Sequence, residues 1–132
     1  MKPRRVELDG VSKRRNVIDC IVSTRREEVT ALSSALISRE MQGLHDFRIA
    51  CKRLRYAMER FCDRVPELEA AAARLAAIQD ALGEAHDRDV LLAILPPTMP
   101  ETEMKLRDER EELVNRAAEI WTSVTAKDWR MT

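Results

Sequence analysis

Apolar residues recur along most of the chain at the three-, four- and seven-residue spacing of amphipathic helices, and no segment alternates like a strand. The first helix is expected from about Ser12 to Gln42-Gly43, where a glycine suits a helix end. The second, from about Leu44 to Arg64, has the clearest pattern. Val65-Pro66 closes it, because the residue before a proline avoids the helical region.

A third helix is expected from about Pro66 to Leu95, and Gly83 is a point where it could bend or divide. The sequence LPPTMP at Leu95 to Pro100 is a firm break. A fourth helix follows from about Glu101 to Ala126. Connections this short favour antiparallel neighbours in space.

The sequence therefore predicts an all-α fold, an antiparallel four-helix bundle over residues 12–126. A basic arm at residues 1–11 precedes it, and this arm could be solvated, extend an anion-binding surface or touch nucleic acid. A tail at residues 127–132 follows, in which Trp129 could dock.

Composition adds a constraint on partners, because the 132 residues carry 23 Lys+Arg and 23 Asp+Glu. Global charge thus predicts no polyanion partner, and any such partner must depend on local clustering. The chain shows no N-terminal apolar run and no stretch near the ~20 residues that span a bilayer. The expectation is a cytoplasmic protein that does not interact with a membrane.

Three cysteines, Cys20, Cys51 and Cys62, form no paired framework. Zinc sites use tighter spacings, so the expected role of these side chains is core packing, with no metal and no cofactor. The chain also lacks a glycine-rich phosphate loop and an activated nucleophile with its base, so it is not expected to be an enzyme.

Positive charge concentrates on the second helix. At roughly 100° per residue, one arc of this helix is apolar. That predicted core face consists of Phe47, Ala50, Cys51, Leu54, Ala57, Met58, Phe61 and Cys62. Beside it runs a narrower stripe, flanked by Tyr56, which we call the basic stripe: His45, Arg48, Lys52 and Arg55. Arg53 and Arg60 point to another side.

The basic stripe has two interpretations. It could be a solvated face that forms salt bridges with acids of the third and fourth helices. It could instead bind an anion, because guanidinium groups and an ammonium beside a core can converge on phosphate oxygens. Like charges at this spacing repel by about 0.2–0.5 kcal/mol per pair. The pattern alone leaves both interpretations open.

Two sequence blocks resemble a known family. LHDFRIACKRLRYAME at residues 44–59 is similar to the signature helix of CHAD domains, the conserved-histidine α-helical domains. Residues 75–90 are similar to the family's downstream block, with Leu82-Gly83 followed by Asp87 and Asp89. The combination, in this order over about residues 44–95, is fairly specific.

This resemblance implies an all-α bundle that binds inorganic polyphosphate without catalysis. It implies His45, Arg48, Lys52, Arg53 and Arg55 as the binding residues, four of which form the basic stripe. Family domains usually hold two helical repeats, whereas this chain has one. We therefore expect a homodimer that rebuilds the two-repeat arrangement around a shared basic groove.

Several alternatives stay open. Asp80, Glu84 and Asp87 share a helix face and could hold Mg²⁺, although ion pairing with arginines is favoured. His86 is interpreted as a helix-surface residue, with a second contact in the binding site as the alternative. Rival functions are a nucleic-acid module, which the scarcity of aromatics disfavours, and a protein–protein module that uses the charged fourth helix.

Overall fold

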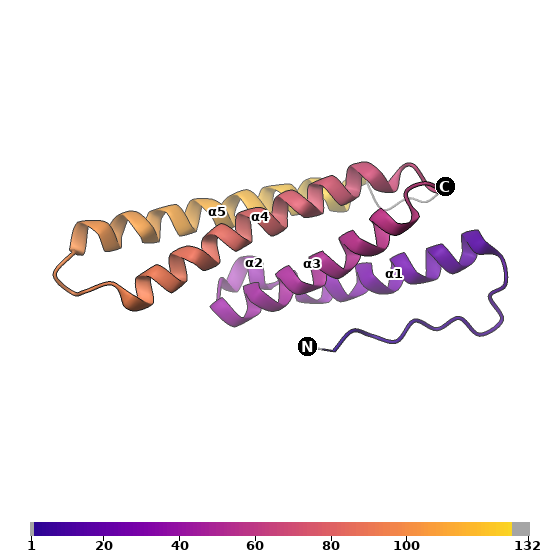
Figure 1. Ribbon diagram of the computed structural model, residues 1–132, viewed down its shortest axis with the longest axis horizontal. Helices are drawn as coiled ribbons and strands as arrows, with labels where there is room; N and C mark the ends of the chain where they lie inside the picture. The colour runs from indigo at the N-terminus through magenta and orange to yellow at the C-terminus, as the bar shows by residue number, and fades with distance from the viewer. Residues whose placement is uncertain (1, 128–132) are drawn as a thin grey trace.

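A computed structural model describes residues 2–127, with side chains through Val124, so the predicted docking of Trp129 lies outside the described residues. Four long helices and one short helix make up the fold (Figure 1). They are α1 (Arg14–Leu32), α2 (Ala35–Ser38), α3 (Met41–Phe61), α4 (Leu68–Ile94) and α5 (Pro100–Lys127). The described residues contain no strand, and the predicted all-α four-helix bundle is confirmed.

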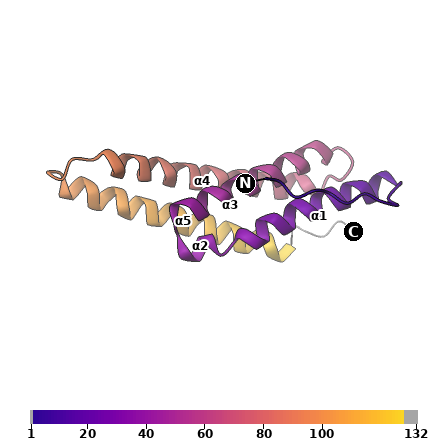
Figure 2. The same cartoon turned by 90° about the horizontal axis from the view of Figure 1, so that it is seen from below.

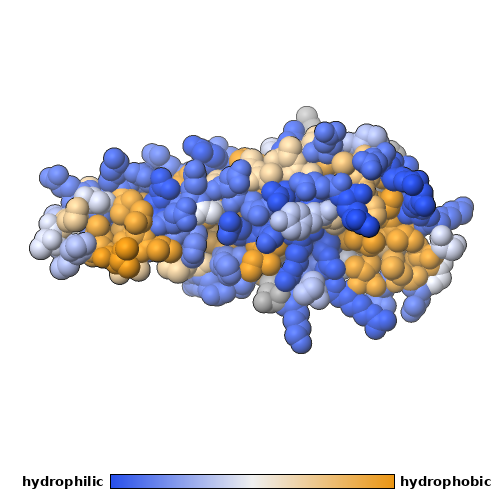
Figure 3. Space-filling model, in the orientation of Figure 1, coloured by the Kyte–Doolittle hydropathy of each residue, from blue (hydrophilic) through white to orange (hydrophobic). Residues whose placement is uncertain are grey.

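Successive long helices run antiparallel, with α3 between α1 and α4, and α4 against α5 (Figures 1 and 2). The hairpin of α4 and α5 projects beyond the other helices. Its far end exposes large apolar side chains, and Figure 3 shows apolar surface there. These side chains are Val90, Leu91, Ile94, Met99 and Met104. No helix among residues 2–127 is long and apolar enough to cross a membrane.

The expected end of the first helix at Gln42-Gly43 is wrong. The helix ends at Leu32, and α2 follows as a separate turn. Arg39 has a left-handed backbone with φ 59°, and Glu40 is extended, so the chain reverses there before α3 begins. Gly43 lies in the first turn of α3, where an added Cβ would be 3.3 Å from the Cβ of Ala35. This glycine permits close packing of α2 on α3 and does not end a helix.

Gly83 neither bends nor divides the third predicted helix, because α4 is continuous across it. The other boundaries differ slightly from the expectation: α3 begins at Met41 and α4 at Leu68. Shifts of this size are ordinary at helix ends.

The core lies along the predicted apolar face of α3. Five of its eight members are buried, while Ala57, Phe61 and Cys62 are half-buried. The Phe47 ring meets Trp121 of α5 edge-on, with centroids 5.5 Å apart and an interplanar angle of 89°. Edge-to-face contacts of this kind are favourable for aromatic pairs. The pair is a contact between α5 and α3, while α5 packs mainly on α4.

The N-terminal arm is irregular, as expected, and folds back along α1 (Figures 1 and 2). Gly10, with φ 77°, forms the reversing turn. The arm is held by Glu28, whose buried carboxylate accepts the backbone N–H of Arg4 at 3.1 Å and pairs with Arg25. Arg25 also donates to the Arg4 carbonyl at 3.0 Å. The arm therefore belongs to the α1 side of the molecule.

Candidate anion-binding site

Arg48 is the most firmly held member of the basic stripe. Its half-buried side chain crosses from α3 to α4, where Nε donates to the backbone carbonyl of Gln79 at 3.3 Å. The guanidinium lies over Gly83, and a Cβ added there would be 3.1 Å from Nη2. Gly83 therefore provides the space that Arg48 occupies. A side chain held in this way loses little conformational freedom when it binds a ligand.

Replacing Gly83 by alanine is expected to weaken polyphosphate binding without lowering the stability of the fold. Alanine is favoured over glycine inside a helix by about 1 kcal/mol, so the free energy of unfolding should stay constant or rise. The new methyl should displace the Arg48 guanidinium and weaken polyphosphate binding by about threefold, through partial loss of one charge-assisted bond. Urea unfolding and a binding titration would measure both effects. An equal loss from G83A in an Arg48→Ala background would contradict this explanation.

Two histidines meet at the start of the basic stripe. The rings of His45 on α3 and His86 on α4 are tilted by 40°, and their centroids are 6.3 Å apart. Both residues line a small hollow that Arg48 and Asp89 also border. The structure thus brings His86 next to the stripe. Ring nitrogens at this place can donate hydrogen bonds to an anion.

The far half of the basic stripe is organised around Tyr56. Lys52 Nζ lies 5.7 Å from the centre of this ring, and Arg55 Cζ lies 4.9 Å from it. Cation–π contacts at exposed sites contribute about 0.5–1 kcal/mol each. Tyr56 therefore helps to orient both cationic heads. The sequence pattern identified it only as a flanking residue, since a ring among cations gives no periodic signal.

Arg53 does not share these contacts. It is half-buried and follows Arg48 by five residues, which places it about 140° around the helix. The structure therefore groups His45, Arg48, Lys52 and Arg55, with His86 beside them. A binding role for Arg53 stays a prediction from the family resemblance.

Acidic side chains of α4 and α5 pair with arginines outside the basic stripe. Asp89 pairs with Arg110, and Glu109 pairs with Arg88 at 3.1 Å. Among the described residues, the only carboxylate within 4.0 Å of a stripe cation is Glu59, which is 3.5 Å from Arg55 on the same helix. The interpretation of the stripe as a face that forms salt bridges with neighbouring helices is therefore wrong. Its positive charge is left largely unneutralised.

The expected ion pairing of Asp80, Glu84 and Asp87 is also wrong. All three are exposed, and in the described part of the chain none has an arginine or lysine partner. The nearby Arg88 instead binds Glu109 and the backbone carbonyl of Glu84. An exposed pair would contribute little, so nothing forces these acids together with a cation. Residues 2–127 contain no group of three or more His, Cys, Asp or Glu arranged to hold a metal.

The three cysteines are free thiols. Cys51 is buried in the core as expected, and burial raises the pKa of its thiol far above the ordinary range. Cys20 and Cys62 are half-buried, and the Cys62 thiol donates to the Glu59 carbonyl at 3.3 Å. Cys51 therefore acts as a packing residue and not as a nucleophile or ligand.

Comparison with known proteins gives one match. A model of the CHAD domain family covers residues 5–96, which extend from the arm through α4. No curated protein and no solved structure matches the chain. CHAD domains are generally binding modules, and the family is linked to polyphosphate. With the signature helix in place on α3 and the match extending over most of the sequence, the chain belongs to the CHAD domain family.

Proposed function

We propose that this protein binds inorganic polyphosphate, without catalysis, through the basic stripe on α3. The supporting observation is that Arg48 and Lys52 have no carboxylate within 4.0 Å among the described residues, while Asp89 pairs with Arg110 and Glu109 with Arg88. A charged group held beside a core and left unneutralised is suited to an external anion. His86 joins the proposed site through its position beside His45, and Arg53 joins it through the family resemblance.

Helix geometry sets the length of ligand that the stripe would suit. Ten residues separate His45 from Arg55, which is about 15 Å along the axis. Orthophosphate can meet only one or two of these heads, whereas a chain of linked phosphates can meet all of them. Affinity is therefore expected to rise with chain length. By analogy with nucleic acids, release of counterions from the polyanion should make binding fall steeply with salt.

The nucleic-acid rival uses the same charges but needs rings for base stacking. Among the described residues, Tyr56 is the only Phe, Tyr or Trp ring in contact with the stripe cations, and Lys52 and Arg55 already lie against it. We expect unlabelled polyphosphate to displace labelled polyphosphate far better than a single-stranded oligonucleotide of equal charge does. The competition is measured by fluorescence anisotropy. Equal or stronger displacement by the oligonucleotide would favour the rival.

We further infer that two chains associate, and the apolar end of the α4–α5 hairpin is the surface that supports this proposal. Ile94 is 73% exposed there, and Met104 is 67% exposed. Apolar surface of this kind is common at contacts between proteins. Sedimentation should show a dimer at micromolar concentration that Ile94→Asp weakens. A strictly monomeric mass over that range would contradict the homodimer. Cytoplasmic localisation stays a prediction.

A further inference from the structure

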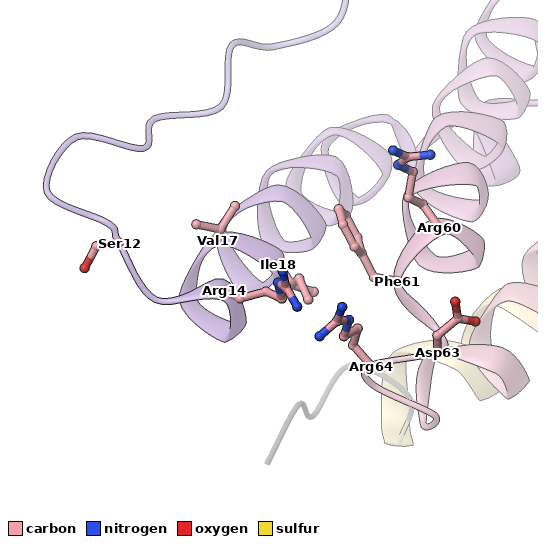
Figure 4. A pocket seen from close by; sticks show the side chains of 8 residues that line it. All are labelled: Ser12, Arg14, Val17, Ile18, Arg60, Phe61, Asp63 and Arg64. Carbon is pink, nitrogen blue, oxygen red and sulfur yellow. The ribbon is translucent and has the colours of Figure 1, made fainter.

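A second basic hollow lies between the start of α1 and the end of α3 (Figure 4). Its volume is about 720 Å³, which is within the range of small-molecule sites. It is lined by Ser12, Arg14, Val17, Ile18, Arg60, Phe61, Asp63 and Arg64. None of these residues belongs to the basic stripe.

Three arginines give the hollow its charge. Arg14 comes from the first turn of α1, Arg60 from the last turn of α3, and Arg64 from the turn that follows. In Figure 4 the heads of Arg14 and Arg64 point toward one another, while the Arg60 head lies beyond Phe61 and points away from them, as does the Asp63 carboxylate. Among the described residues, none of the three arginines has a carboxylate partner. The like charges of Arg14 and Arg64 repel one another unless an anion lies between them.

The start of α1 adds to this positive potential. Its N-cap, Lys13, makes no side-chain capping bond, and the first turn holds no acid. The first N–H groups of a helix lack internal partners, and its dipole favours negative charge there. Here the turn carries Arg14 and Arg15 instead. An anion in the hollow would relieve this unfavourable arrangement.

The floor of the hollow is apolar. Ile18 of α1 points toward the space beside Phe61 of α3, and Val17 also lines the hollow. Figure 3 shows apolar surface framed by hydrophilic side chains at this end of the molecule. An inorganic anion would leave this floor in contact with water. A ligand that joins an anionic group to a flat apolar body could cover it, with its ring against Phe61.

The hollow is separate from the basic stripe. Arg60 follows Arg55 by five residues, about 140° around α3. The exposed acid Glu59 lies at the end of the basic stripe, one residue before Arg60, and the exposed Asp63 lies in the turn that follows α3. A single polyanion that reached both the stripe and the hollow would have to pass the Glu59 carboxylate. The two basic surfaces are therefore distinct.

We propose that this hollow is a second binding site, specific for a nucleoside di- or triphosphate. The phosphates bind Arg14 and Arg64 near the start of α1, Arg60 adds positive charge at the edge of the hollow, and the base packs on Phe61 and Ile18. Arg14 and Arg64, with Arg60 at the edge, have no carboxylate partner in the described part of the chain, and they match the charge of a di- or triphosphate better than the single charge of a peptide carboxylate. The site does not depend on polyphosphate binding at the basic stripe.

The test compares two double variants by calorimetry with ATP and with tripolyphosphate. Arg14→Ala with Arg64→Ala should weaken ATP binding by about tenfold or more, through lost charge-assisted bonds. Arg48→Ala with Arg55→Ala should leave ATP affinity within about twofold. In this second variant, ATP should bind about tenfold more tightly than tripolyphosphate, which has the same phosphates and no base.

Each contrary result overturns a stated part of the proposal. No binding of ATP to the wild-type protein, or equal losses in the two variants, would remove the second site. Equal affinity for ATP and tripolyphosphate in the Arg48→Ala, Arg55→Ala variant would show an anion hollow with no recognition of a base. As a second readout on the wild-type protein, ATP should slow phenylglyoxal modification of Arg14 and Arg64 and not of the exposed Arg107. Unchanged rates at Arg14 and Arg64 would also contradict the site.

Discussion

Replacing Arg48 and Arg55 together by alanine is expected to weaken binding of long-chain polyphosphate by about 100-fold or more. Each guanidinium can make charge-assisted hydrogen bonds worth about 1.5–3 kcal/mol, and each 1.4 kcal/mol is tenfold in affinity. Neither side chain is part of the core, so the helical circular dichroism should not change. The measurement is a titration of fluorescent polyphosphate into both proteins at one salt concentration.

The matched control removes two arginines elsewhere. Arg107 and Arg116 lie on α5 and are exposed. Their double alanine variant has the same net charge as the Arg48→Ala, Arg55→Ala protein. Binding should stay within about threefold of wild type, because charges separated by more than the ~8 Å Debye length are largely screened at physiological salt. Similar losses in both variants would mean that general charge, and not the basic stripe, attracts the ligand.

Replacing Phe47 by alanine should lower the free energy of unfolding by about 3–5 kcal/mol. Phe47 is fully buried, and its ring is the contact through which Trp121 joins α5 to α3. Its removal leaves a cavity and ends the edge-to-face contact. A loss of this size is a large part of the stability of an ordinary domain, about 5–15 kcal/mol. Urea unfolding followed by circular dichroism measures the change.

The control for Phe47→Ala is Ile37→Ala. Ile37 is a large apolar side chain that is 86% exposed, so its removal should change stability by about 0.5 kcal/mol or less. If the two variants lost equal stability, the burial of Phe47 would not be the source of its effect. A small loss in Phe47→Ala would contradict the packing of α5 on α3.

Helix α3 could be predicted closely from the sequence because its apolar and basic residues occupy separate arcs. The break before it could not be predicted. Arg39, an arginine with a left-handed backbone, ends α2, and no turn signal in the sequence indicated it. The helix end is expected at Gln42-Gly43 because glycine often ends helices, and this position is wrong. Gly43 and Gly83 both provide space for a neighbouring side chain, Ala35 and Arg48 respectively, and such space depends on how separate helices pack together.

The same limit applies to the binding site. The sequence could place Arg48 on a different side of the helix from Arg53 and Arg60, because the angular position of a residue depends only on local helix geometry. The salt-bridge partners of the acidic residues on α4 and α5 could not be predicted from helix angles. Whether Asp89 faces Arg48 or Arg110 depends on how α4 packs on α5, and the structure shows that it pairs with Arg110. His86 became a member of the site only when α4 was placed beside α3.

The most direct test of polyphosphate binding at the basic stripe is a titration of the wild-type protein with long-chain polyphosphate at 50 and 200 mM salt. If the four arginine and lysine heads of the proposed site, Arg48, Lys52, Arg53 and Arg55, each neutralise a phosphate, the logarithm of affinity should fall by roughly 2, by the counterion-release relation established for nucleic acids. A titration that shows saturable binding at low salt and a loss of about 100-fold at high salt would agree with the account. Absence of binding at low salt, or an affinity that does not change with salt, would contradict it.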